Sequence, residues 1–97
     1  MTDKKYILKG KEIVEASLME WATFFEGKDR IVKQETLPNG LRVSTVFLGI
    51  DHNFGDGEPL LFESMVFGIK DDEEIQQRYS TYEQAEKGHQ ELVEKYK

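Results

Sequence analysis

The strongest pattern of apolar and polar positions lies in the middle of the chain. Two runs rich in β-branched residues, 30–36 and 41–50, flank a short segment that contains Asn39-Gly40. Asn-Gly readily adopts the two positive φ angles of a type I′ turn, so these runs predict an antiparallel hairpin with a two-residue loop. In that register Gln34 lies across from Thr45, and the end of the hairpin far from the turn is expected to be the most buried.

Further extended segments surround this hairpin. Residues 60–68 are apolar on both faces, a pattern that is typical of a central strand. Tyr6-Ile7-Leu8 predicts a short strand, and Ile13-Val14 predicts a second short extended piece. The acidic residues 71–74 indicate a solvated loop or the start of a helix.

Two capping boxes predict two helices. Ser17 with Glu20, and Thr81 with Gln84, have the spacing at which two side chains satisfy free backbone N–H groups at a helix start. The first helix is expected over 17–26. Its apolar residues at helical spacing are Leu18, Trp21 and Phe25. The apolar face of the second helix carries Ala85, His89, Leu92 and Tyr96, with Val93 beside them.

These elements predict a single α+β domain over residues 1–97. Its expected architecture is an antiparallel sheet of three to five strands with a central hairpin, covered by two helices. A chain of 97 residues is long enough for one hydrophobic core. No repeat or linker divides it.

Composition narrows the classes of function. The formal charge is −6, and the basic residues form no strong cluster, so general nucleic-acid binding is not expected. The chain has no cysteine, which excludes disulfides, thiolate metal sites and thiol nucleophiles. No apolar stretch approaches the roughly 20 residues of a membrane-spanning helix, and the N-terminal residues lack the apolar run of a signal peptide. We therefore expect a cytoplasmic protein without a cofactor or a membrane partner.

The densest polar cluster is the glycine-rich loop 51–58. If the protein binds a metal ion, its expected ligands are Asp51, His52 and Asp56, with Glu63 from the next strand. The loop departs from the calcium-loop template, because a glycine holds the fifth position, where an acid belongs. The alternative is a turn-rich connection whose Asp and Asn side chains bind local backbone N–H groups.

His52 and His89 are the only histidines. His52 with Asp51 or Glu63 would suit general acid–base chemistry. No nucleophile elbow, phosphate-binding loop or metalloprotease motif accompanies it. His89 lies on the apolar face of the C-terminal helix, where a hydrogen-bonded core histidine is the alternative to a functional one.

Glu63 and Arg78 are the charged residues that most need an explanation. Glu63 interrupts a strand that looks buried on both faces. Its carboxylate therefore needs a partner, which is Arg42, Arg78 or Thr45, or else it recognises a ligand. Arg78 and Tyr79, followed by two hydroxyl residues, precede the C-terminal helix, whose N-terminus favours an anion. The alternative there is helix capping beside a surface arginine.

Three segments resemble those of a family of short bacteriophage-encoded proteins. They are RVSTVFLGIDH at 42–52, LFESMVFG at 61–68 and RYST at 78–81, the last continuing to Gly88-His89. The similarity covers most of the chain. It implies expression inside an infected bacterium and an accessory role there, and it implies no particular activity.

Three functions follow as hypotheses. The first is a non-enzymatic phage accessory protein that binds a host protein or a small anionic, nucleotide-like ligand, with host defence as its target. Its expected ligand-binding residues are Thr45, Asp51, His52, Glu63, Arg78, Tyr79 and His89. The second is a small metal-dependent hydrolase built on Asp51, His52, Glu63 and His89. The third is a structural or assembly subunit, and a homo-oligomer is expected because strands that are apolar on both faces often complete their core by self-association.

Overall fold

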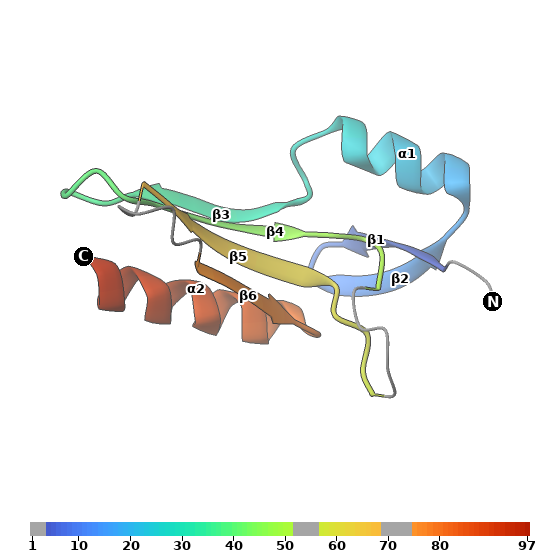
Figure 1. Cartoon of the computed structure of the whole chain (residues 1–97). Helices are drawn as coiled ribbons and strands as arrows, with labels where there is room; N and C mark the ends of the chain where they lie inside the picture. The colour runs from blue at the N-terminus through green and yellow to red at the C-terminus, as the bar shows by residue number, and fades with distance from the viewer. Residues whose placement is uncertain (1–3, 52–56, 69–74) are drawn as a thin grey trace.

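The computed structural model describes residues 4–51, 57–68 and 75–97. Within them the elements follow in the order β1 (Lys5–Lys9), β2 (Glu12–Ala16), α1 (Leu18–Glu26), β3 (Ile31–Thr36), β4 (Arg42–Phe47), β5 (Phe62–Phe67), β6 (Ile75–Tyr79) and α2 (Tyr82–Tyr96) (Figure 1). β1 and β2 form a two-stranded sheet, and the other strands form a sheet in the order β3-β4-β5-β6. All of these pairings are antiparallel, which confirms the predicted α+β fold.

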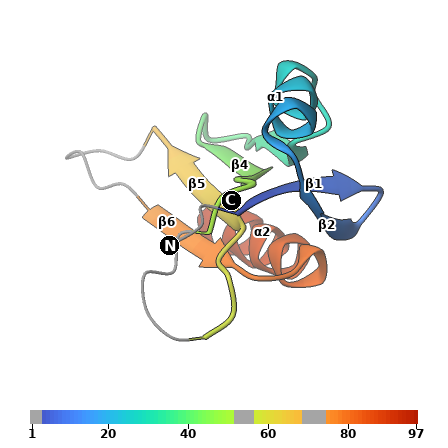
Figure 2. The ribbon, with the colours of Figure 1, turned by 90° about the vertical axis from the view of Figure 1, so that its right-hand side faces the viewer.

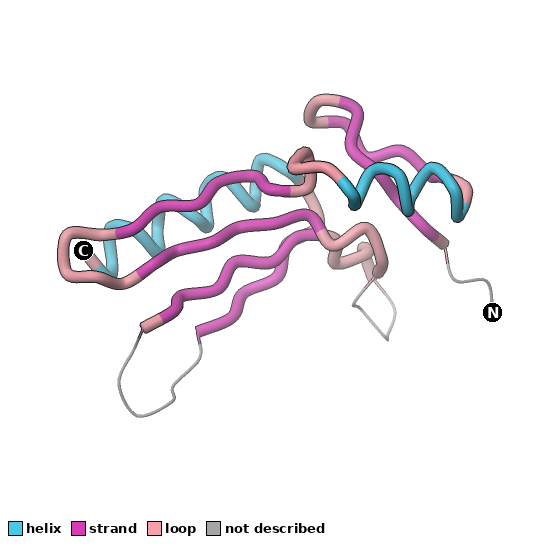
Figure 3. Tube along the Cα trace, turned by 90° about the horizontal axis from the view of Figure 1, so that it is seen from above, coloured by secondary structure: helices cyan, strands magenta, loops and turns pink. Residues whose placement is uncertain are grey.

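The four-stranded sheet has two different faces, which we call the covered face and the open face. α2 packs along the covered face, while no described helix or strand lies over the opposite face of β5 and β6 (Figure 3). Side chains alternate between the faces of a strand. Thr45 of β4 contacts His89 of α2 and so lies on the covered face, which places its neighbours Ser44 and Val46 on the open face.

The central hairpin is present, but its predicted two-residue turn is wrong. The N–H of Leu37 donates to the carbonyl of Leu41 at 2.7 Å, and the N–H of Gly40 donates to the carbonyl of Leu37 at 2.9 Å. The loop therefore has three residues, Pro38, Asn39 and Gly40. A two-residue loop would pair Pro38 with Leu41, and proline has no N–H to donate across that pair. Gly40, with a φ of 90°, supplies the left-handed residue that closes the longer turn.

The longer loop shifts the predicted register by one residue. Glu35 lies across from Val43, and Gln34 lies across from Ser44 rather than from Thr45. Because side chains alternate with a period of two, this shift moves the side chains of residues 33–36 to the other face, while a β-bulge between Ile31 and Lys33 leaves Ile31 on the face of Val46. Glu35 therefore lies on the covered face beside α2, and Gln34 lies on the open face.

β6 is the strand that the sequence pattern did not predict. Its five residues include two glutamines and an arginine, and they pair with β5 without a register shift. A polar segment forms a strand here because β5 presents an edge with which it can pair. Strand formation at this position is decided by tertiary pairing rather than by intrinsic propensity.

α1 and the β1–β2 hairpin form a unit at one end of the sheet, with α1 and α2 on opposite sides of it (Figures 1 and 2). The capping box of Ser17 and Glu20 begins α1 as predicted, yet no residue of α1 is buried. Trp21 and Phe25 dock the helix over Gly49. A Cβ at Gly49 would lie 2.6 Å from an atom of each ring, so only glycine leaves room for them.

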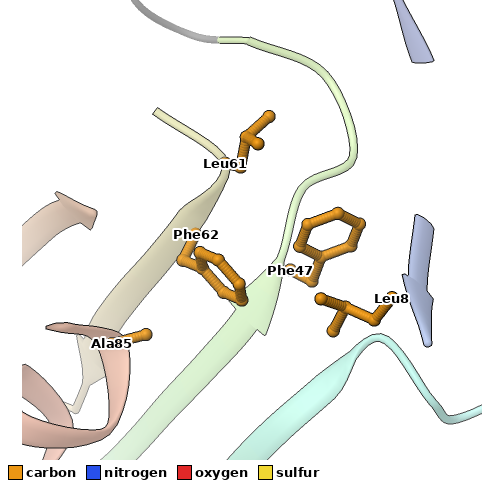
Figure 4. Close-up of a cluster of buried hydrophobic side chains, with 5 residues drawn as sticks. All are labelled: Leu8, Phe47, Leu61, Phe62 and Ala85. Atoms are coloured by element: carbon orange, nitrogen blue, oxygen red, sulfur yellow. The ribbon is translucent and has the colours of Figure 1, made fainter. Parts of the chain in front are cut away.

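The core divides into two apolar clusters on the covered face. The first consists of Leu8, Phe47, Leu61, Phe62 and Ala85, with Phe47 between Leu8 and Phe62 (Figure 4). The second consists of Leu37, Val43, Val66, Leu92 and Val93. Along α2, His89 lies between the helix residues of the two clusters, as the predicted apolar face of this helix requires.

Candidate functional site

Between the two apolar clusters, a row of polar side chains crosses the covered face. We call it the polar row. Its members on successive strands, directly opposite one another, are Lys33, Thr45, Ser64 and Gln77, joined by Glu35 and by His89 from α2. Thr45 and Ser64 are fully buried, and only 1% of His89 is exposed. Buried polar atoms are tolerated only when they are hydrogen-bonded, so the contacts within this row decide whether it stabilises the fold.

The buried members of the row satisfy one another. Thr45 Oγ1 lies 2.5 Å from Ser64 Oγ and 2.7 Å from His89 Nδ1. His89 Nε2 lies 2.9 Å from Glu35 Oε1, and Lys33 Nζ lies 3.1 Å from the same oxygen. The row thus connects the centre of the sheet to the partly exposed carboxylate of Glu35.

The carboxylate decides the direction of these hydrogen bonds. Hydrogen bonds from Lys33 and from His89 hold the pKa of the Glu35 carboxyl below its usual range, so this group accepts and does not donate. In the neutral tautomer that donates from Nε2 to Glu35, Nδ1 accepts from the Thr45 hydroxyl. The oxygen of Thr45 also meets Ser64 Oγ, so both of its buried neighbours are within hydrogen-bond distance.

A hydroxyl, an imidazole and a carboxylate in this order also occur in enzymes with a nucleophilic serine or threonine. The burial of Thr45 and Ser64 excludes that chemistry in this conformation, because no substrate carbonyl can reach either hydroxyl. A hollow of about 170 Å³ opens beside the ring. It is lined by Val32, Lys33, Glu86, His89 and Gln90. Its two charged groups have partners, since Lys33 pairs with Glu35 and Glu86 pairs with Lys11. The buried members of the polar row therefore bind one another inside the core.

Tyr79 lies on β6, at the edge of the covered face opposite to Glu35 on β3. Its hydroxyl donates to Gln77 Oε1 at 3.0 Å. Burial raises the pKa of the Tyr79 phenol, and a hydrogen bond with Ser64 opposes that effect only in part. The ring packs on Gly88 of α2, where a Cβ would lie 2.2 Å from the Tyr79 hydroxyl oxygen. The glycine in the middle of this helix is therefore explained by the ring beneath it.

The open face carries a second polar cluster. Arg78 Nε lies 3.0 Å from Glu63 Oε2, and Gln76 Nε2 donates to the same oxygen at 2.8 Å. Glu63 and Arg78 are directly opposite each other on β5 and β6. Of the partners expected for Glu63, the structure shows Arg78 and not Arg42 or Thr45. The carboxylate is 12% exposed and the guanidinium 35%, so the pair remains accessible from the open face.

Apolar and cationic side chains surround that cluster. Phe67 is 40% exposed, and the guanidinium carbon of Arg42 lies 4.9 Å from the centre of its ring. Val46 and Met65 are half-buried on the same face. Gln34 Nε2 donates to Ser44 Oγ at 3.0 Å. The open face therefore mixes arginine, methionine and an aromatic ring with uncharged polar groups.

The predicted site residues do not gather in one place. Glu63 and Arg78 lie on the open face, whereas Thr45, Tyr79 and His89 lie on the covered face, so the sheet separates the two groups. Asp51 lies beyond the end of β4, where its Oδ1 accepts from the N–H of Leu60 at 2.9 Å. His52 and Asp56 lie outside the described residues. In the part of the chain that the structure describes, no three His, Asp or Glu side chains are close enough to hold a metal ion.

The N-terminus of α2 was predicted to suit an anion or a helix cap, and the structure shows the cap. Thr81 Oγ1 accepts from the N–H of Gln84 at 3.1 Å. Gln84 Oε1 accepts from the N–H groups of Ser80 and Thr81 at 2.9 and 3.2 Å. Glu83 adds a negative charge to the first turn. The cap therefore binds the N–H groups of Ser80, Thr81 and Gln84 at this end of α2.

Five residues of these clusters were not predicted from the sequence, namely Lys33, Glu35, Ser64, Gln76 and Gln77. Glu35 was placed on the wrong face by the two-residue turn. Ser64 and Gln76 carry no local signal, because their importance comes from neighbours on other strands. Pro38 was the available clue to Glu35, since its missing N–H argues against the two-residue loop.

Comparison with known proteins shows no relationship. No protein-family model, no curated protein and no solved structure matches the chain. Among the described residues, neither helix has the length and apolar character to cross a membrane.

Proposed function

We propose that this protein is a non-enzymatic binding module that docks another protein on the open face of its sheet. The observation that carries the proposal is a sheet face that no described helix or strand covers over β5 and β6 and on which Phe67 is 40% exposed. A sheet whose second face meets only water usually alternates apolar and polar side chains cleanly. Here Val46 and Met65 lie on that second face as well. Apolar groups in such a position favour contact with a partner.

The residue types on the open face match those of protein interfaces. Arginine, methionine and aromatic residues are enriched where proteins bind each other, and lysine and aspartate are depleted. The charged residues on the open face of the four strands are Arg42, Arg78 and Glu63, so this face is cationic by one charge in a chain of net charge −6. A partner with an apolar centre and acidic residues around it complements both properties.

A small anion is a weaker candidate than a protein. Arg78 is neutralised by Glu63 at 3.0 Å, and Arg42 stacks on Phe67. At the start of α2, the N–H groups of Ser80, Thr81 and Gln84 are bound by the helix cap. No concave group of free cations remains among the described residues, whereas a broad face with an exposed ring is what a protein binds.

The biological setting is a further part of the proposal. The similarity of 42–52, 61–68 and 78–81 to bacteriophage-encoded proteins supports an accessory role in the cytoplasm of an infected bacterium. In that setting the partner is a host protein. We infer that binding blunts host defence by occupying the surface of that host protein.

Site-specific photocrosslinking in bacterial cells tests the docking face. A photoreactive phenylalanine analogue is placed at Phe67, at Met65 or, as a control, at Gln90 on the exposed side of α2. We expect one host protein to be crosslinked from Phe67 and Met65 and not from Gln90. Crosslinking of no host protein, or of the same proteins from all three positions, would overturn the proposal.

Calorimetry with the purified partner then tests its charge. Arg42→Glu should weaken binding by about tenfold or more, as loss of a central arginine commonly does. Lys87→Glu on α2 makes the same change in net charge away from the open face and should leave affinity within about twofold. Equal loss in both variants would show that only net charge matters and would contradict a specific face. Saturable heat on titration with ATP would instead assign the site to a small anion.

A further inference from the structure

The two edges of the four-stranded sheet differ in how they are protected. An edge strand presents unpaired N–H and C=O groups and can pair with another strand, so proteins commonly blunt it with bulges or lysine. β3 has both devices, because its register is interrupted between Ile31 and Lys33 and the Lys33 side chain is 55% exposed. That edge is closed to a further strand.

β6 has neither device. It pairs with β5 over all five residues without a bulge, and it contains no proline, glycine or lysine. Gln76, Gln77 and Arg78 are exposed, and no described helix or strand lies along its outer edge (Figure 3). A regular, uncovered edge of this kind is suited to the addition of a strand.

We propose that the strand added to β6 is β6 of a second copy of this chain, paired antiparallel about a two-fold axis at Gln77. In this register Ile75 of one copy lies opposite Tyr79 of the other on the covered face. On the open face Gln76 lies opposite Arg78. No like charges are directly opposed, which is the arrangement that stabilises cross-strand pairs. The strand is complementary to itself, as a two-fold interface requires.

The charges around β6 permit this pairing. The two copies of Arg78 lie diagonally, two positions apart along the strands, and each is bonded to Glu63 of its own chain at 3.0 Å. Ile75 and Tyr79 are half-buried in one chain and lose further exposure when a strand covers them. The pairing therefore adds backbone hydrogen bonds and apolar contact without bringing together unpaired guanidinium groups.

The assembly would be a continuous sheet of eight strands. A two-fold axis that relates adjacent antiparallel strands runs perpendicular to the sheet, so both open faces lie on the same side. The pairing itself does not depend on the proposed docking of a host protein. The dimer would, however, present two open faces side by side to such a partner.

Engineered cysteines test the axis, because the natural chain has none. Directly opposed residues of antiparallel strands have Cα atoms about 4.5–5.5 Å apart, within the range that a disulfide spans. Gln77→Cys should therefore form a disulfide-linked dimer on mild oxidation, at least about tenfold faster than the matched exposed variant Gln90→Cys. Equal rates for the two variants would overturn the proposed axis.

Sedimentation of the unmodified protein provides a test that no substitution can disturb. The mass should rise with concentration from 11.3 kDa toward twice that value.

A pair of charge variants at the axis gives a second test. Gln77→Lys and Gln77→Glu should each lower self-association, since each places like charges opposite each other at the axis. An equimolar mixture of the two variants should restore self-association. A mass of 11.3 kDa at all concentrations, or a mixture no more associated than its components, would overturn the proposal. Because these measurements use purified protein alone, their failure leaves the host-protein proposal standing.

Discussion

Thr45 holds the polar row together, because its single hydroxyl meets two buried partners. Its Oγ1 lies 2.7 Å from His89 Nδ1 and 2.5 Å from Ser64 Oγ. A fully buried network of this kind stabilises the fold only while every member is satisfied. The polar row therefore makes the core depend on individual atoms rather than on apolar area alone.

Thr45→Val should destabilise the protein although it preserves side-chain shape. The change removes the hydroxyl that meets both Ser64 Oγ and His89 Nδ1, and leaving the buried Nδ1 without this partner costs about 1–3 kcal/mol. Denaturant unfolding of the two proteins measures the difference. Thr36→Val, the same change at an exposed position on β3, should alter stability by less than about 0.5 kcal/mol. A neutral effect of Thr45→Val would show that the network contributes nothing.

The lowered pKa of the Glu35 carboxyl predicts that the stability of the protein depends on pH. Bonds from Lys33 and His89 lower the pKa of this carboxyl in the folded protein. A lowered folded-state pKa adds stability above the unfolded value of about 4.3, and this contribution is lost as the pH falls through the folded value. Glu35→Gln should therefore be less stable than the natural protein at pH 6, and the difference should shrink by pH 3. Urea midpoints across this range test it; parallel curves would contradict the assignment.

Single residues differ in how far their sequence neighbourhood reveals them. The capping residues Ser17 and Thr81 act on N–H groups three positions away, and their role was predicted. Glu63 was expected to need a charged partner, and burial alone supports that inference. Glu35 reaches His89 across 54 positions of sequence, so only the folded chain brings them together.

Among the elements, α1 is held least firmly. None of its residues is buried, and Leu18 and Met19 are 67% and 77% exposed. Its attachment depends on aromatic rings that contact Gly49 and Phe47. A short helix without a buried face gains its stability from such contacts rather than from propensity.

Gly49→Ala should loosen α1 without unfolding the sheet. The glycine has a φ of 73°, and a Cβ would lie 2.6 Å from Trp21 Nε1 and from Phe25. Trp21 is the only tryptophan, so its fluorescence should shift to longer wavelength as water reaches the ring. Gly40 also has a positive φ, but a Cβ added there would meet nothing within 4 Å. Gly40→Ala should therefore leave the tryptophan emission unchanged. An unchanged spectrum in Gly49→Ala would show that α1 is held elsewhere.

The hairpin shows how one residue decides an element's register. Asn39-Gly40 marked the reversal of the chain correctly, but Pro38 moved the closing pair from Pro38–Leu41 to Leu37–Leu41. The alternation of apolar residues in β3 did not reveal the difference, because both of its faces mix apolar and polar side chains. Where patterning is ambiguous, the geometry of the turn sets the register.

The whole molecule consists of a four-stranded sheet with α2 and a smaller unit of β1, β2 and α1. The smaller unit contributes only Leu8 to the buried core. Its backbone links to the rest of the chain include a bond from Tyr6 N–H to the Gly49 carbonyl at 2.8 Å and a bridge between Lys5 and Ile50. A two-stranded sheet with so few anchors is marginal on its own.

Hydrogen exchange should resolve these two units. We expect amides of β1, β2 and α1 to open at lower free energy than those of β4 and β5, whose residues are the most buried of the molecule. Protection factors measured residue by residue give the comparison. Equal protection throughout would show that the chain opens only as one cooperative unit.

The sequence by itself determined the α+β class, both helix starts, the central hairpin and the apolar face of α2. These follow from contacts within a few residues and from periodicity, which are properties of the local chain. Only the tertiary structure decided that β6 is a strand, that Glu35 meets His89, and that Glu63 and His89 lie on opposite faces of the sheet. Each of these depends on strand register or on pairing between distant segments. A shift of one residue exchanges the faces and so changes which side chains meet.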